Sequence, residues 1–318
     1  MIQICMVAGA NAISYAEHAI ESLFRNCAQD FSFALITDKL ADKVAYETVL
    51  SRLAPRGPIQ VVDEDYCDRM ASEFFKNHPN VQRFRKGHPC WRKITDPSLI
   101  APPGADIIVL DPDIYFPNRF LFEATRPGQL LLMRQQRHCL LPDHVVQTAF
   151  RMKLSLAHHT DIGVAQHTAL PWDWIDQVIV QLGGEGLPRV PHIESILWAA
   201  IAMKIGGGYL DSKKWSCWER TAVKRLLMIA GIQGALMLRL EKINAMKCFH
   251  ASSGAKDWLV EGYRRGLLQG NMQQLEPSPV EPYIELTQQA YQKGERLKAR
   301  YHAILRAVRL RDPLRAQG

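Results

Sequence analysis

Short apolar runs alternate with amphipathic segments in the first part of the chain. The runs have the length and composition of buried strands, and they lie at 2–7, 31–37, 59–62 and 107–110. Between the first two runs, Ala16, Ile20, Leu23 and Phe24 repeat as on one face of a helix. Ser14 and Glu17, with the spacing of a capping box, predict that this helix begins at Ser14. Strand, helix and strand in this order predict an α/β fold with a mostly parallel sheet and a right-handed crossover.

Elements of both kinds are also predicted in the second half. Strands are expected at 129–133 and 161–164, helices at 172–181 and 195–203, and a mostly helical stretch at 219–246. Three further segments are predicted to be a glycine turn at 206–208, a linker at 277–282 and a last helix from 282 to about 311. We expect a catalytic domain at 1–258, with halves at about 1–116 and 117–258, and a basic helical extension at 259–318.

Composition places the chain among globular proteins with a substantial core, since 47% of its 318 residues are hydrophobic and 22% are charged. No apolar run approaches the ~18 residues that a membrane-spanning helix needs, and the first residues lack the basic region of a signal peptide. The seven cysteines form no Cys-x-x-Cys pair, so neither a zinc knuckle nor a disulfide framework is indicated. A cytoplasmic protein is expected.

The net charge of +7 is concentrated at the C-terminal end, where residues 293–318 contain eight basic and two acidic residues. The same stretch carries an apolar stripe at Leu297, Tyr301, Ile304, Leu305 and Val308. One interpretation is peripheral contact with an anionic membrane at its inner face. The other is packing on the catalytic domain or on a second subunit in an oligomer. No nucleic-acid partner is expected.

Polar residues follow the strands at the positions where a parallel sheet collects its ligands. Asp111 and Asp113 leave the run at 107–110, separated by Pro112, and paired carboxylates of this kind suit a hard divalent cation. An ordinary strand-to-turn exit is the alternative. The small-residue turn and Asp38 follow neighbouring strands and share the same carboxyl edge; the turn consists of Ala8, Gly9, Ala10 and Asn11. Neither a Gly-x-Gly-x-x-Gly nor a Walker sequence occurs, which argues against a classical NAD or ATP site.

Further candidates lie on the predicted helices. Arg92 and Lys93 precede the aspartate strand, where they could reach a diphosphate or simply end a solvated helix. Glu194 stands near a helix N-terminus, a position that favours an acidic residue for electrostatic reasons alone. The histidines at 138, 144, 158 and 159 match no standard zinc spacing.

Together with Asp111-Pro112-Asp113, the segment from His250 to Trp258 resembles glycosyltransferase family 8, the glycogenin and bacterial galactosyltransferase group of GT-A enzymes. That family has Asp-x-Asp and, further on, His-x-x-Gly-x-x-Lys-Pro-Trp. His250, Lys256 and Trp258 keep the offsets, whereas Gly254 comes one place late and Asp257 replaces the proline. The resemblance spans about residues 1–258 and implies a GT-A type, Rossmann-like fold.

The resemblance also implies roles for these residues. Asp111, Asp113 and His250 are the expected ligands of Mn²⁺ or Mg²⁺, and Lys256 with Gly254 is expected at the diphosphate. Ala8 to Asn11, Asp38 and Arg92 or Lys93 match the positions that hold the nucleotide. Glu194 and Asp161 are the expected catalytic residues. Asp161 stands at the family's Asn-Ala-Gly-Val asparagine, and Glu194 at a glutamine beneath the sugar, although Ile193 departs from that motif.

The implied reaction moves a sugar from a nucleoside diphosphate sugar, such as a UDP-sugar, to a hydroxyl of a saccharide, glycolipid or protein, with retention. Surface polysaccharide synthesis is one setting for such a reaction. Two roles remain open for the Glu194 carboxylate: it could act as a nucleophile, or as the base of an inverting reaction. One alternative is a phosphohydrolase with Asp111 as nucleophile, although Ile114-Tyr115 follow where a small hydroxyl residue is usual. The other is a nucleotide-sugar-binding module without catalysis.

Overall fold

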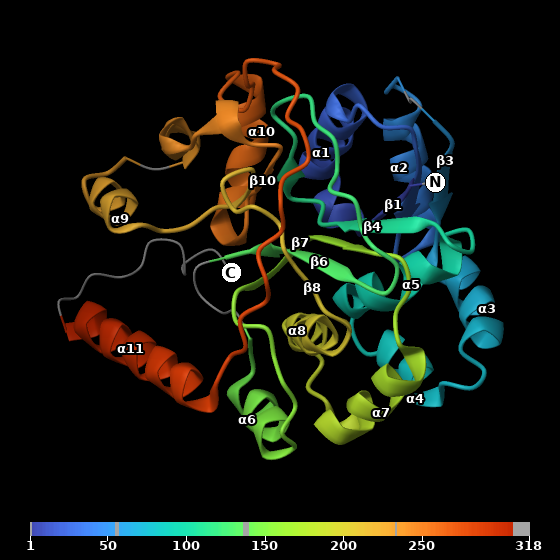
Figure 1. The fold of residues 1–318 in the computed structure, drawn as a ribbon. Coiled ribbons are helices and arrows are strands. Elements are labelled where there is room, and N and C mark those ends of the chain that lie inside the picture. Colours follow the sequence, from blue (N-terminus) through green and yellow to red (C-terminus); the bar gives the residue numbers. More distant parts are fainter. Residues whose placement is uncertain (1, 55–56, 136–139, 233, 308–318) are drawn as a thin grey trace.

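Seven strands form one sheet in the part of the chain that the computed structural model describes, residues 2–54, 57–135, 140–232 and 234–307 (Figure 1). The spatial order is β3-β2-β1-β4-β7-β6-β8. The bounds are β1 Ile2–Val7, β2 Phe31–Ile36, β3 Ile59–Val62, β4 Asp106–Leu110, β6 Leu130–Arg134, β7 Thr160–His167 and β8 Gly207–Tyr209. Only β7 runs antiparallel to its neighbours, so the predicted α/β fold with a mostly parallel sheet is confirmed.

Alternating residues of β1 point into two different cores. Ile4 and Met6 pack with α1 and α2, whereas Cys5 and Val7 face the opposite layer, which contains α3, α5 and α8 (Figure 1). The helices are α1 Ile13–Asn26, α2 Leu40–Leu50, α3 Glu64–Phe74, α4 Pro79–Arg85, α5 Arg92–Ile100, α6 Asp143–Arg151, α7 Trp172–Leu182, α8 Ile193–Ile205, α9 Ala222–Ile229, α10 Asp257–Arg264 and α11 Gln288–Ala307. Because both faces of the sheet are covered, its strands are almost wholly apolar.

A second, three-stranded sheet holds the later part of the chain against the first. Its order is β5-β10-β9, with β5 at Ile114–Tyr115, β9 at Trp215–Cys217 and β10 at Cys248–His250. A third core lies behind it, built around Trp218, Phe249 and Trp258. The segment after Trp258 packs back as well, since Leu268 belongs to this core and Leu286 and Tyr291 to the core of α8.

Four local predictions are wrong. Helix α1 begins at Ile13 without a side-chain cap, because the 3-10 turn Ala10–Ala12 runs directly into it, so Ser14 is not an N-cap. The glycines at 206–208 enter strand β8, paired with β6. Among the described residues of 219–246 only α9 is α-helical; the rest includes the 3-10 turns η4 at Gly234–Leu240 and η5 at Ile243–Ala245.

The last helix begins at Gln288 rather than Pro282, and 308–311 lie outside the described residues. The preceding stretch is extended because its backbone pairs with the domain. Glu281 exchanges hydrogen bonds with Tyr209, and Leu286 donates to Leu156 at 2.7 Å. The expected linker at 277–282 is thus partly bound to the sheet.

Gly207 tests the pairing of β8. Its φ is +124°, and a Cβ added there would lie 1.9 Å from the carbonyl oxygen of Leu130. Gly207→Ala should therefore lower the free energy of unfolding by about 3 kcal/mol or more, because backbone must move. Gly104 also has a positive φ but open space around it, so Gly104→Ala should cost only about 1–2 kcal/mol. If chemical denaturation gives the same loss of unfolding free energy for both variants, the close pairing of β8 with β6 does not constrain residue 207.

Candidate active site

Asp111, Asp113 and His250 meet where the two sheets join. Asp111 follows β4, and its backbone N–H donates to Gly163 of β7 at 3.0 Å. Asp113 precedes β5, and its carbonyl accepts from Ala251 at 2.9 Å. Since His250 of β10 pairs with Ile114, its ring stands beside both carboxylates. His250 Nε2 lies 3.4 Å from Asp113 Oδ1 and 3.7 Å from Asp111 Oδ2.

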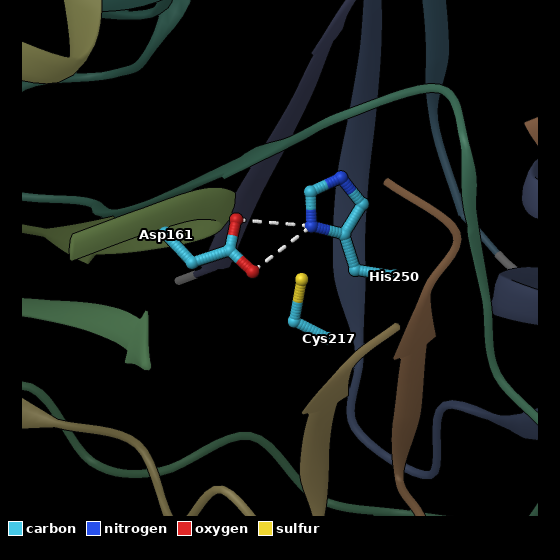
Figure 2. A group of neighbouring side chains, drawn as sticks. All are labelled: Asp161, Cys217 and His250. Atoms are coloured by element: carbon cyan, nitrogen blue, oxygen red, sulfur yellow. Dashed lines mark hydrogen bonds and ion pairs between the residues drawn. The ribbon is translucent and has the colours of Figure 1, made fainter. Parts of the chain in front are cut away.

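Asp161 of β7 holds the other side of the imidazole. His250 Nδ1 lies 3.0 Å from each carboxylate oxygen of Asp161, whereas Nε2 points away from it (Figure 2). The Asp161 carboxylate also accepts from the N–H of Gly163 at 3.1 Å. A Cβ on Gly163 would lie 2.5 Å from His250 Nδ1, so a glycine is required for the ring to lie against β7. Asp161 is therefore a positioning residue for His250.

The charge state of His250 follows from these neighbours. Burial lowers its pKa, but the carboxylates of Asp161 and Asp113 outweigh burial and hold the pKa of His250 well above its ordinary value. Burial conversely raises the pKa of Asp161, and the His250 ring more than offsets this and lowers it. Without a cation, the imidazolium is the counter-ion of the carboxylates.

The three side chains fit a divalent cation. Ligands at ~2.1 Å from one ion and at right angles to each other lie about 3 Å apart, close to the separations around His250 Nε2. The ligand atoms of Asp111, Asp113 and His250 all lie within 4.8 Å of one another. A proton kept on Nδ1 by Asp161 leaves Nε2 as the ligand atom, the arrangement common among metal-bound histidines. The donor set, two carboxylates and one imidazole, suits Mn²⁺ or Mg²⁺.

Cys217, which the sequence did not single out, completes a second group with Asp161 and His250 (Figure 2). It lies opposite His250 in the pairing of β9 with β10, a neighbour relation that no local motif announces. Burial raises the pKa of the Cys217 thiol to about 12. The thiol therefore stays protonated, and its Sγ lies 3.4 Å from the Ser252 hydroxyl. We assign Cys217 to packing around His250.

Lys93 links the metal candidates to Glu194. Its ammonium group forms an ion pair with Asp111 and lies 3.5 Å from Glu194 Oε2. Both partners are buried, because α5 and α8 pack face to face beside the sheet, and α8 is apolar apart from Glu194, Ser195 and Lys204. Trp198 Nε1 donates to Glu194 Oε1 at 3.3 Å. Burial and the Asp111 charge raise the pKa of Glu194 to about 8 although Lys93 opposes them.

Arg92 points to a different partner from Lys93. It forms an ion pair with Asp38 at the end of β2, and its Nη1 lies 3.4 Å from the Thr37 carbonyl. Gly9 faces the same aspartate, because a Cβ there would lie 2.6 Å from Asp38 Oδ2. Ala8 is buried below this turn, whereas Ala10 and Asn11 are exposed. Of the predicted nucleotide residues, Gly9 and Arg92 are thus neighbours of Asp38.

Two other groups of predicted residues complete the comparison with the sequence. Gly254 and Lys256 lie on the 3-10 turn Ser253–Lys256 directly after β10, and Lys256 is exposed. Among the described residues, the groups able to hold a metal include neither His144 nor the stacked pair His158 and His159. His138 lies outside the described residues.

No protein-family model and no curated protein matches the sequence. Among solved structures, mouse xyloside xylosyltransferase 1 aligns with 80% of this chain and 98% of its own, at 12% identity and a TM-score of 0.51. The chain has a GT-A type fold. GlyE of Streptococcus pneumoniae aligns with 84% of this chain and 60% of its own, at 13% identity and a TM-score of 0.49. The galactosyltransferase LgtC aligns with 84% of this chain and 95% of its own, at 14% identity and a TM-score of 0.46.

The role of Asp161 can be measured through the metal. Asp161→Ala removes the acceptor that orients His250, so the affinity for Mn²⁺, read by calorimetry, should fall by about 10–100-fold. Asp211→Ala, at an aspartate that caps the N–H of Lys213 on the surface, is the matched control and should leave affinity unchanged. Unchanged affinity in Asp161→Ala would remove Asp161 from the site.

The substitution Lys93→Met tests how much Lys93 stabilises the buried carboxyl groups of Asp111 and Glu194. Without the ammonium group, the free energy of unfolding should fall by ~3–5 kcal/mol at neutral pH. Loss of Lys93 raises the folded pKa of Glu194 above its wild-type value of about 8, so the Glu194 part of the deficit should be constant below about pH 8 and grow above it. Lys86→Met, at an exposed lysine paired with Asp68, should change stability little at any pH. A deficit independent of pH would contradict the coupling.

Proposed function

We propose that this protein is a metal-dependent glycosyltransferase that uses a nucleoside diphosphate sugar as donor. The observation that carries the proposal is the convergence of Asp111, Asp113 and His250 from two sheets on the carboxyl edge of β4. In parallel sheets this edge is where ligands bind. The GT-A type fold and the cluster at Gly9, Asp38 and Arg92 on the same edge support a nucleotide there.

Each group has a distinct job in this proposal. Asp111, Asp113 and His250 Nε2 hold Mn²⁺ or Mg²⁺, which when bound supplies Lewis-acid stabilisation of the departing diphosphate. Asp161 keeps the proton of His250 on Nδ1. Lys256, with Gly254 beside it, adds charge at the diphosphate, while Gly9, Asp38 and Arg92 surround the nucleoside, together with Ala8, Ala10 and Asn11.

Glu194 belongs to the sugar side of the site. With its pKa raised to about 8, its carboxyl is largely protonated at neutral pH and can donate a hydrogen bond to a sugar hydroxyl. A glutamine amide donates in the same way, which agrees with the glutamine that family 8 has there. We therefore infer family 8, transfer with retention and a UDP-sugar donor, with a saccharide, glycolipid or protein acceptor such as a growing surface polysaccharide.

Asp111→Asn and Asp113→Asn should each abolish Mn²⁺-dependent thermal stabilisation by UDP. Each should also lower donor turnover by ~10²–10³-fold, the effect of losing one preorganised electrostatic group. Asp106→Asn, at the amino end of the same strand, is the matched control and should behave as wild type. Scanning fluorimetry with UDP, GDP and CDP, with and without Mn²⁺, identifies the base.

Three outcomes would redirect the proposal. Full turnover in EDTA would refute metal dependence. Release of inorganic phosphate from phosphate esters, lost in Asp111→Asn, would indicate a phosphohydrolase. If the protein binds nucleotide but transfers the sugar neither to an acceptor nor to water, it is a binding module without catalysis. The configuration of the product at its anomeric carbon, read by NMR, decides between retention and inversion.

A further inference from the structure

The excursion between β9 and β10 exposes a row of large apolar side chains. Two α9 residues stand out, since Leu226 is 67% and Ile229 66% exposed. Val223 on α9 and three residues after it are exposed as well: Ile232, Leu236 and Leu240. We call these six residues the α9–η4 surface. A helix of a globular domain normally turns such side chains inward, so this face is built to meet something outside the domain.

Basic residues lie within and next to this segment of the chain. Residues 219–242 contain five basic and two acidic residues, and one of the acids, Glu241, is engaged by the buried Lys224 at 2.6 Å. Beside it, a hollow of about 480 Å³ is lined by Arg239 and Lys242. Apolar side chains ringed by guanidinium and ammonium groups are typical of helices that lie in the interface of an anionic bilayer.

Helix α11 contributes to the same side of the molecule. The guanidinium group of Arg225 on α9 lies 4.7 Å from the ring centre of Tyr301 on α11. Tyr301 is 37% exposed, and Leu297, one turn earlier, is 56% exposed. Figure 1 shows α9 and α11 on one side of the sheet. Leu297 and Tyr301 of the last helix and the α9–η4 surface can therefore meet one flat partner.

We propose that the α9–η4 surface docks on an anionic lipid bilayer. Phosphate groups of lipid headgroups would face Arg239 and Lys242, while Leu226 and Ile229 enter the acyl boundary. A second copy of the chain fits less well, because a two-fold contact through this patch would bring the same cations together. Docking would also hold the active site near the membrane, since Trp218 at the start of the excursion donates to the His250 carbonyl at 2.8 Å.

The proposal is independent of the catalytic function, because the test uses neither donor nor metal. Full-length protein is sedimented with vesicles of phosphatidylglycerol and phosphatidylcholine, and with vesicles of phosphatidylcholine alone. We expect binding to the first only, weakened by salt. Leu226→Ser with Ile229→Ser should reduce binding by about tenfold or more. The matched control, Leu40→Ser with Val44→Ser, removes two exposed apolar residues of α2 and should bind as wild type.

Arg239→Glu provides a second variant that leaves the apolar residues intact. It should bind the anionic vesicles several-fold less tightly, with part of the salt dependence lost. Binding by Leu226→Ser with Ile229→Ser equal to wild type would overturn the proposal. So would light scattering that shows a dimer which this variant converts to monomer, because the surface would then serve a second copy of the chain.

Discussion

The burial of one imidazole among three carboxylates is the constraint on which the site depends. His250 is carried by the small sheet, whereas Asp111 and Asp161 belong to the edge of the large one. Removal of the ring would leave these carboxylates buried against each other, a cost of several kcal/mol. The same ring therefore joins the two sheets and prepares the ligand set. Close approach is possible only because residue 163 lacks a side chain.

Asp111 belongs to two charge groups at once. It faces His250 on one side and Lys93 on the other, and Lys93 continues to Glu194. The carboxylates of Asp111, Asp113 and Asp161 carry one negative charge more than Lys93 and the His250 imidazolium offset, because Glu194 largely keeps its proton at neutral pH. A bound divalent cation would bring the group to neutrality once His250 gives up its Nε2 proton. Affinity for the metal and stability of the empty site are thus two consequences of one charge distribution.

The later part of the chain organises the surface around this centre. The excursion between β9 and β10 begins and ends beside His250, so the α9–η4 surface is tied to the site by two strands. The segment before α11 runs back along the sheet and pairs with Tyr209. Residues far apart in sequence therefore share one side of the molecule, as Arg225 and Tyr301 do. Among the described residues, no helix is long and apolar enough to cross a bilayer.

Local sequence determined the features whose causes are local. Buried runs at 2–7 and 107–110 become β1 and β4 because their apolar residues demand burial on both faces, and the aspartates follow because strand ends expose polar groups. The His250 segment was recognised by its spacing. Arg92 and Lys93 are adjacent in the sequence, which does not show that their side chains point to different partners.

Only the tertiary structure decided the rest, because its causes are long-range. The pairing of β9 with β10 places Cys217 beside His250, and the packing of α5 on α8 joins Lys93 to Glu194. The glycines at 206–208 are predicted to form a turn, yet pairing with β6 places Gly207 and Gly208 in a strand. Segment 219–246 reads as helical because its propensities are high, yet only α9 forms an α-helix there. Burial and pairing between distant residues outweigh such local preferences, and they are what converts separate polar residues into one site.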